Sequence, residues 1–159
     1  MDSINLIRKK ILISGRKLEI SVSGNSMEPS IRDGDTILIA YVPTYAVGDV
    51  IVFVYEYNVL VHRILKIENG FLCCKGDNSF RLEHISFDEI LGKVTKVNDL
   101  EIGMFPRKLL RLSYGIGKIF EKNKSVEFTK SKLKYKRYKK CIAHLFEDSI
   151  VKEGNEHER

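Results

Sequence analysis

Short apolar runs separated by turn residues fill the stretch from Lys17 to Val97. Runs of this length, bounded by Gly, Asp and Asn, are typical of β-strands. The predicted strands cover residues 17–22, 36–41, 50–55, 60–68, 70–75 and 89–97. The Asn69-Gly70 pair lies between two of them and predicts a tight hairpin turn. The pattern therefore predicts a mainly β fold, a small barrel or coiled sheet, without alternating βαβ units.

The pattern changes after Leu100, where apolar residues recur at helical spacing. The spacing of apolar residues over 106–120 predicts a helix with Pro106 in its first turn. Gly115 and Gly117 weaken this prediction, because glycine has a low helix propensity. A second helix is predicted over residues 130–146, and the polar residues beyond it predict a frayed end. These boundaries divide the chain into an N-terminal segment (1–16), a β domain (17–100), a helical tail (101–150) and a disordered end (151–159).

Length and composition are those of one compact domain with a tail. The chain has 159 residues, of which 43% are hydrophobic and 30% charged, which excludes wholesale disorder and a disulfide scaffold. The net charge of +6 is uneven. Residues 1–100 hold 12 Lys and Arg against 13 Asp and Glu, whereas residues 101–159 hold 15 against 8. The basicity therefore belongs to the tail.

The cysteines and the apolar runs bear on the cellular compartment. Three cysteines and a start without an apolar signal segment favour a reducing, cytoplasmic location. Cys73 and Cys74 are expected to be small buried residues on opposite faces of a strand. No zinc-type spacing of Cys and His is present, so we expect no metal and no other cofactor. No run approaches the roughly 20 apolar residues that cross a bilayer, so we expect no transmembrane helix.

The stretch from Ser23 to Asp35 carries the most informative chemistry. Ser26 follows Gly24-Asn25 and precedes Met27 and Pro29, which can present its hydroxyl on a constrained loop. A serine is a poor nucleophile unless a base lies within hydrogen-bond reach. His62 is the candidate base, because strand alternation places it on an apolar face with Leu60 and Ile64. A lone histidine there is more often a core residue.

The position of Asp77 favours a catalytic role for His62 over that of a core residue. If the strands at 60–68 and 70–75 pair, Asp77 returns near the level of His62 and can orient its imidazole. The three side chains would then form a Ser-His-Asp arrangement.

Four motifs occur in order: GNSMEPSIRDGD, GDVIVF, VHRI and KGDNS. Together they resemble the type I signal peptidase and LexA-like serine peptidase superfamily over roughly residues 20–97. The resemblance implies that fold and makes Ser26 the nucleophile. Bacterial signal peptidases and LexA-like proteins have a base Lys where this chain has His62. The chain is thus most similar to the endoplasmic-reticulum and archaeal-type signal peptidases, which implies an orienting role for Asp77 and a second acidic position at Glu83.

Two departures from the superfamily shape the expected chemistry. Bacterial signal peptidases have a serine that helps to bind the oxyanion at the position of Gly24. Here the oxyanion would instead be bound by the backbone N–H of Ser26 and by a donor such as Asn25. Asn25 and Met27 belong to the same oxyanion and substrate loop. The usual membrane anchor is missing, which favours a leader or propeptide over ordinary secretory substrates. A self-cleaving repressor is not expected, because only about twenty residues precede the fold and no Ala-Gly bond is present.

The sequence therefore predicts a serine endopeptidase that cleaves a leader, signal or propeptide. The alternative is an inactive peptidase fold that binds peptides or an anionic membrane. Residues 105–140 hold 13 Lys and Arg against two Glu, with aromatic residues between them. We expect this segment to bind the inner face of an anionic membrane rather than nucleic acid. The reason is that apolar residues at 109–120 could insert into the membrane beside the charges. His84 is interpreted as a surface residue.

Overall fold

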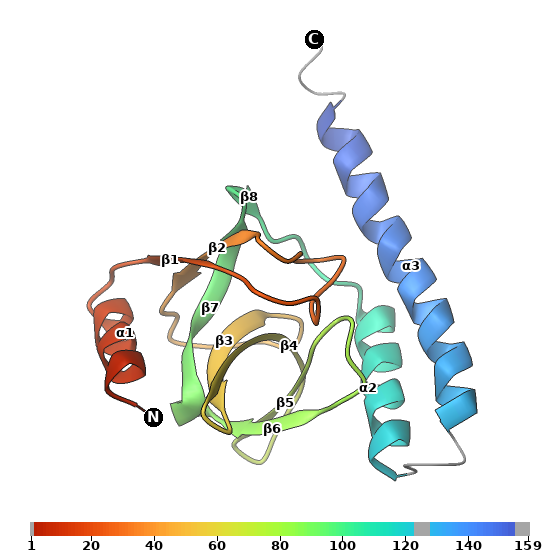
Figure 1. The fold of residues 1–159 in the computed structure, drawn as a ribbon, viewed down its shortest axis with the longest axis horizontal. Coiled ribbons are helices and arrows are strands. Elements are labelled where there is room, and N and C mark those ends of the chain that lie inside the picture. Colours follow the sequence, from red (N-terminus) through yellow and green to blue (C-terminus); the bar gives the residue numbers. More distant parts are fainter. Residues whose placement is uncertain (1, 123–127, 155–159) are drawn as a thin grey trace.

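The computed structural model describes residues 2–122 and 128–154. The helices and strands follow one another, with a single 3₁₀ turn η1, as α1 (Ser3–Ile13), β1 (Leu18–Ser21), β2 (Thr36–Ala40), β3 (Val50–Tyr55), β4 (Asn58–Glu68), β5 (Phe71–Lys75), β6 (Glu83–Ser86), η1 (Phe87–Glu89), β7 (Ile90–Val97), β8 (Leu100–Glu101), α2 (Arg107–Lys122) and α3 (Phe128–Gly154). Figure 1 shows the strands between α1 on one side and the pair α2 and α3 on the other.

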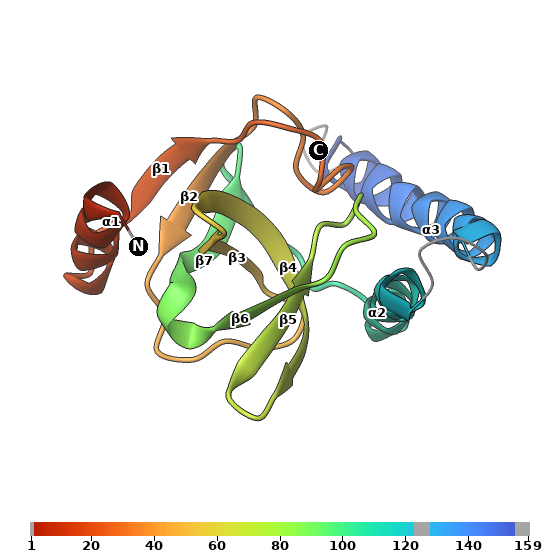
Figure 2. The same ribbon diagram turned by 60° about the horizontal axis from the view of Figure 1, so that its bottom comes forward.

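The strands form one antiparallel sheet in the order β1-β2-β7-β3-β4-β5-β6, and β8 adds to β7. The sheet coils into a half-barrel, as the turned view in Figure 2 shows. The predicted mainly β fold with a helical tail is confirmed. All six predicted strands are present, within two residues of the predicted bounds. The short strands β6 and β8 and helix α1 were not predicted.

Two-residue turns set the register of the central hairpins. Asn69 and Gly70 have φ values of 51° and 80°, so Glu68 pairs with Phe71 across the β4–β5 turn. Both central residues of a type I′ turn need positive φ, which Asn and Gly tolerate. The predicted hairpin is therefore confirmed. The β3–β4 hairpin has the same geometry at Glu56 and Tyr57, residues that carry no such signal in the sequence.

Three apolar clusters form the core. One lies between α1, the loop of residues 22–35 (the Ser26 loop) and strands β2, β3 and β7: Leu12, Met27, Ile31, Ile37, Ile39, Val50, Val52, Leu91 and Val94. The second lies on the other face of the central strands: Ile51, Phe53, Ile64, Leu72, Cys74, Ile85 and Ile90. The third joins the sheet to α2 and α3: Leu65, Cys73, Leu82, Phe105, Leu109, Leu110, Ile116, Tyr138 and Ile142. Cys73 and Cys74 are thus buried in different clusters, as predicted.

Helix α1 is held by a cap at its start and by one apolar contact. The Asp2 carboxylate accepts the N–H of Asn5 at 2.8 Å, which satisfies a free helix donor. Leu12 is fully buried against β7, where Gly92 leaves room: a Cβ at Gly92 would lie 3.3 Å from Leu12 Cδ1. The N-terminal segment 1–16, to which the sequence analysis assigned no element, therefore contains a docked helix.

The tail packs against the sheet as two helices. Leu109, Leu110 and Ile116 of α2 are buried, as are Tyr138 and Ile142 of α3. Helix α3 continues to Gly154, so the prediction of a disordered end is wrong for residues 151–154. Residues 155–159 lie outside the described residues. Among the described residues, we find no helix with the length and apolar character that crossing a membrane requires.

The two glycines of α2 give a matched test of this packing. A Cβ at Gly117 would lie 2.5 Å from Leu82 Cγ and Cδ2, whereas a Cβ at Gly115 would have nothing within 4 Å. Gly117→Ala should lower the free energy of unfolding by about 1–3 kcal/mol through overpacking. Gly115→Ala should raise it by up to about 1 kcal/mol, because Ala is the better helix former. Urea denaturation of both variants checks this, and equal effects would contradict the packing.

Candidate active site

Ser26 lies on an ordered loop between β1 and β2. Gly24 has a φ of 98°, a conformation that favours glycine, and its N–H donates to Asp33 Oδ1 at 2.7 Å. Further along, the N–H of Arg32 donates to Asp35 Oδ2 at 2.7 Å. The loop is therefore held at both ends, and Ser26 is exposed between them. A serine in place of Gly24 would be strained, which explains this departure from the bacterial pattern.

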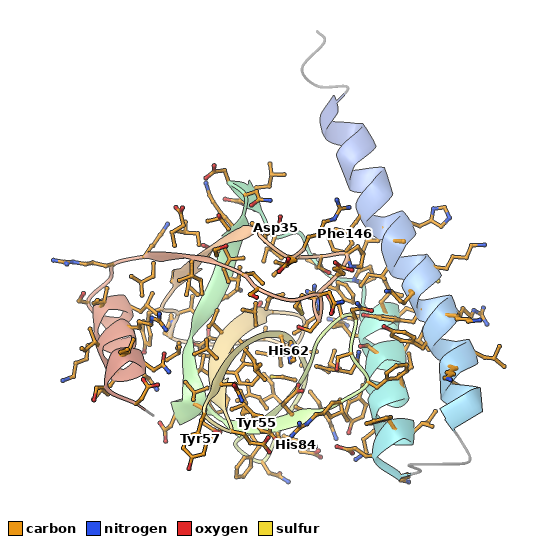
Figure 3. The ribbon with its side chains drawn as sticks, viewed as in Figure 1. Asp35, Tyr55, Tyr57, His62, His84 and Phe146 are labelled. Carbon is orange, nitrogen blue, oxygen red and sulfur yellow. The ribbon has the colours of Figure 1, made fainter. Side chains whose placement is uncertain are left out.

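The hydroxyl of Ser26 meets the ring of His62. The distance from Ser26 Oγ to His62 Nε2 is 3.2 Å. His62 is 4% exposed and packs edge-on against Phe53, with 6.0 Å between the ring centroids. Figure 3 shows it near the middle of the molecule, within the curve of β3 and β4. Strand alternation does place His62 with the apolar residues of its face, as the sequence indicated.

Glu83 supplies the second partner of the imidazole. Its Oε2 lies 2.9 Å from His62 Nδ1, and both side chains are buried. Pairing explains the contact: Ile64 lies opposite Cys74, and Cys74 lies opposite Glu83. Residues opposite one another on adjacent strands share a face, and His62 lies two positions from Ile64 on that face. Strand β6, which begins at Glu83, therefore brings this carboxylate to the histidine.

Asp77, predicted to orient His62, instead pairs with Arg63 on the opposite face of β4. Arg63 Nε donates to Asp77 Oδ1 at 2.9 Å and Nη2 donates to Oδ2 at 2.7 Å. Arg63 lies opposite Lys75 in the sheet, so Asp77, two residues later, follows the face away from His62. The Ser30 hydroxyl also donates to Asp77. Asp77 therefore ties the loop after Ser26 to β4, and its carboxylate is engaged by Arg63 and Ser30 rather than by the imidazole.

The turn after β5 lies directly against the Ser26 loop. The N–H of Asn78 donates to the carbonyl of Ser26 at 2.7 Å, and Asn78 Nδ2 donates to the carbonyl of Asn25 at 2.9 Å. A Cβ at Gly76 would lie 2.5 Å from the same Ser26 carbonyl and 2.9 Å from His62 Nε2. Only glycine leaves room for this approach. The KGDNS motif thus positions Ser26 and His62 through its glycine and asparagine.

Helix α3 reaches the same turn. The hydroxyl of Tyr135 donates to Asn78 Oδ1. Because Asn78 also bonds to the Ser26 loop, it links the tail to that loop. Arg63 lies 3.9 Å from the ring centroid of Phe105, and Lys75 Nζ lies 5.4 Å from that of Tyr138. The segment after β7 therefore covers the buried charged residues behind the site. No pattern in the sequence predicts these contacts.

A cleft of about 300 Å³ opens beside Ser26. Its walls come from strand β1, the start of the Ser26 loop, the first half of β4 and helix α1. The lining residues include Arg8, Ile20, Gly24, Met27 and Leu60. Strand β4 pairs with β3 from Asn58 onward but with β5 only from Arg63 onward. Within the described part of the chain, the second edge of residues 58–62 thus has no strand partner. The cleft can accept an extended chain.

The remaining residues that the sequence analysis singled out lie outside the contacts among Ser26, His62 and Glu83. Met27 is 2% exposed in the first core cluster and forms the floor of the cleft. Asn25 is exposed, and its carbonyl rather than its side chain makes the contact with Asn78. His84 is exposed and lies 3.0 Å from Glu121, so it is a surface residue as interpreted. Leu109, Leu110 and Ile116, three of the apolar residues that were expected to insert into a membrane, are buried against the sheet.

The comparisons with known proteins agree with this architecture. A family model described as Peptidase S24-like matches residues 4–95, more than half of the chain. The matched range runs from α1 to β7 and contains Ser26, His62 and Glu83. Helices α2 and α3 lie outside it. The search of curated proteins found no match.

Lys75 gives a pH test of the buried charge behind the site. Burial lowers the pKa of its amine to about 8, while Nζ donates to the carbonyls of Gly76 and Ser79 at 2.8 and 2.7 Å. The unfolded chain keeps the ordinary lysine value of 10.5 and so binds more protons than the folded chain between about pH 8 and 10.5. Stability should therefore rise with pH across this window.

Lys75→Met isolates that contribution, because all other groups titrate in both proteins. The unfolding free energy of the wild type minus that of the variant should increase by roughly 3 kcal/mol from pH 8 to 10.5. Urea denaturation at several pH values measures this difference. A difference independent of pH would contradict a lowered pKa for Lys75.

Proposed function

The chain belongs to the Peptidase S24-like family, and from this premise we propose that it is a serine endopeptidase with Ser26 as nucleophile and His62 as base. The observation that carries the proposal is the line of contacts Ser26 Oγ–His62 Nε2–His62 Nδ1–Glu83 Oε2, at 3.2 and 2.9 Å. An exposed hydroxyl, a base and an orienting carboxylate in this order are the arrangement that activates a serine for acyl transfer.

The proposed reaction uses the neutral imidazole. His62 Nδ1–H donates to Glu83, which leaves the Nε2 lone pair directed at the Ser26 hydroxyl. Nε2 takes the hydroxyl proton as Oγ attacks the peptide carbonyl, and the imidazolium then protonates the leaving amine. Water hydrolyses the acyl-enzyme by the same two proton transfers. The backbone N–H of Ser26 is the proposed donor to the oxyanion.

A histidine base rather than a lysine base is part of this proposal. Lys75 is a buried lysine with a lowered pKa, which in other settings would suit a serine-lysine pair. Its amine, however, is engaged by the carbonyls of Gly76 and Ser79. It extends from the face of β5 that lies opposite Arg63, away from His62. These contacts support the Ser-His type of signal peptidase as the nearer mechanistic relative.

The proposed substrate is an extended peptide, a leader or propeptide with small residues beside the cut bond. The unpaired edge of β4 at residues 58–62 can hydrogen-bond a peptide main chain as an added strand. Apolar residues of the cleft, among them Ile20, Met27 and Leu60, would receive its side chains. The preference for small residues rests on the resemblance to signal peptidases.

Labelling with a fluorophosphonate serine probe tests the proposal. The wild type should be labelled at Ser26, Ser26→Ala should not be labelled, and His62→Ala should react about 10²- to 10⁴-fold more slowly. Ser30→Ala, which lacks the hydroxyl on Asp77 but keeps Ser26 and His62, is the control for the site of reaction. A folded wild type that is never labelled would favour the inactive, peptide-binding alternative.

The two carboxylates can be told apart by paired substitutions. Glu83→Gln should slow labelling by about 10²-fold or more, because the imidazole loses the acceptor-only carboxylate that fixes its tautomer, and an amide can also donate. Asp77→Asn should chiefly lower the unfolding free energy, by about 3–5 kcal/mol, because it leaves buried Arg63 uncompensated. Labelling rates and denaturation curves of both variants separate these effects. The opposite pattern, with slow labelling only in folded Asp77→Asn, would return the orienting role to Asp77.

A further inference from the structure

Helix α1 presents large apolar side chains to solvent. Ile4, Leu6, Ile7 and Ile13 are 63, 48, 56 and 55% exposed. At helical spacing these four residues cover the outer half of the helix, and Lys10 is the charged residue among them. Figure 1 shows α1 at the edge of the molecule, away from α2 and α3. The apolar face therefore has no partner within the described structure.

The opposite side of the helix is fixed. Leu12 is fully buried and Asn5 is 3% exposed. Lys9 Nζ donates to the carbonyl of Asp88 at 2.5 Å, which ties the middle of the helix to η1. The helix cannot rotate to bury its outer face without losing these contacts. The exposure of Ile4 and Ile7 is thus a property of the folded protein.

Basic residues surround the apolar face. Residues 3–17 contain Arg8, Lys9, Lys10, Arg16 and Lys17 and no Asp or Glu. A short helix with an apolar face and a basic border matches the interface of an anionic membrane, where apolar side chains enter the acyl boundary and ammonium groups meet phosphates. Lys10 can bury its stem and keep its charge at the headgroups.

We propose that α1 lies in the plane of an anionic phospholipid surface and holds the protein there. The tail residues Leu109, Leu110 and Ile116, which were expected to make the apolar contact, are buried, whereas the four apolar residues on the outer face of α1 are exposed. Arg8 and Leu12 of the same helix also line the Ser26 cleft, so the mouth of the cleft would lie close to the lipid. The contact does not depend on catalysis and can be tested separately from it.

Sedimentation of the full chain with vesicles tests the contact. Wild type should sediment with vesicles of phosphatidylcholine and phosphatidylglycerol, sediment less with phosphatidylcholine alone, and be released by salt. Ile4→Ser with Ile7→Ser should weaken binding by about tenfold or more. Met104→Ser with Leu133→Ser is the matched control, since these residues are 97 and 68% exposed elsewhere and should not change binding.

A fluorescent reporter gives a second readout, because the chain contains no tryptophan. Ile7→Trp should shift its emission to the blue on anionic vesicles, and Leu133→Trp should not. Fluorophosphonate labelling without vesicles should be the same in the Ile4→Ser, Ile7→Ser variant as in wild type, which separates a failure here from a failure of the proposed function. Unchanged binding in that variant would overturn the proposal. So would a dimer of the wild type that becomes monomeric on the two substitutions, because a second copy would then cover the face.

Discussion

The approach of the Gly76 backbone to Ser26 and His62 is the constraint on which the rest of the site depends. A single methyl group at this position would lie 2.5 Å from the Ser26 carbonyl and 2.9 Å from His62 Nε2. Ser26 and Gly76 are 50 residues apart in sequence, so their contact requires the strands between them to be folded. Asn78 secures that contact with two hydrogen bonds to the Ser26 loop. The geometry of the Ser26 hydroxyl and the His62 ring is thus a consequence of the sheet.

Strand β4 separates two kinds of polar chemistry by alternation. On one face His62 contacts Ser26 and Glu83, with an open cleft in front of the hydroxyl. On the other face Arg63 and Asp77 form a buried ion pair that Phe105 covers. A buried pair of this kind costs free energy to desolvate and gains little net stability, but it enforces one arrangement of the groups it joins. Here those groups are β4 and the loop that follows Ser26.

The sequence predicts the parts of this arrangement that depend on local pattern. The strands, the Asn69-Gly70 hairpin and the apolar face of His62 follow from alternation and turn chemistry, and the motifs indicate Ser26 and His62. The choice between Asp77 and Glu83 depends on the register of β5 with β4 and on β6, a four-residue strand with one apolar residue, Ile85, which is too short to be predicted from its sequence. Helix α1 was missed because its apolar residues lie on the outer face as well as the inner one.

The tail belongs to the architecture of the site although the family match ends at residue 95. The Tyr135 hydroxyl donates a hydrogen bond to Asn78, the residue that holds the Ser26 loop. The Tyr138 ring covers the amine of Lys75. Without these rings the Lys75 amine would regain water, and the desolvation that lowers its pKa would disappear. The turn at Gly76 would then lose its cover on the side away from the cleft. Helices α2 and α3 therefore act as the outer support of a candidate site whose side chains, Ser26, His62 and Glu83, all lie in the half-barrel.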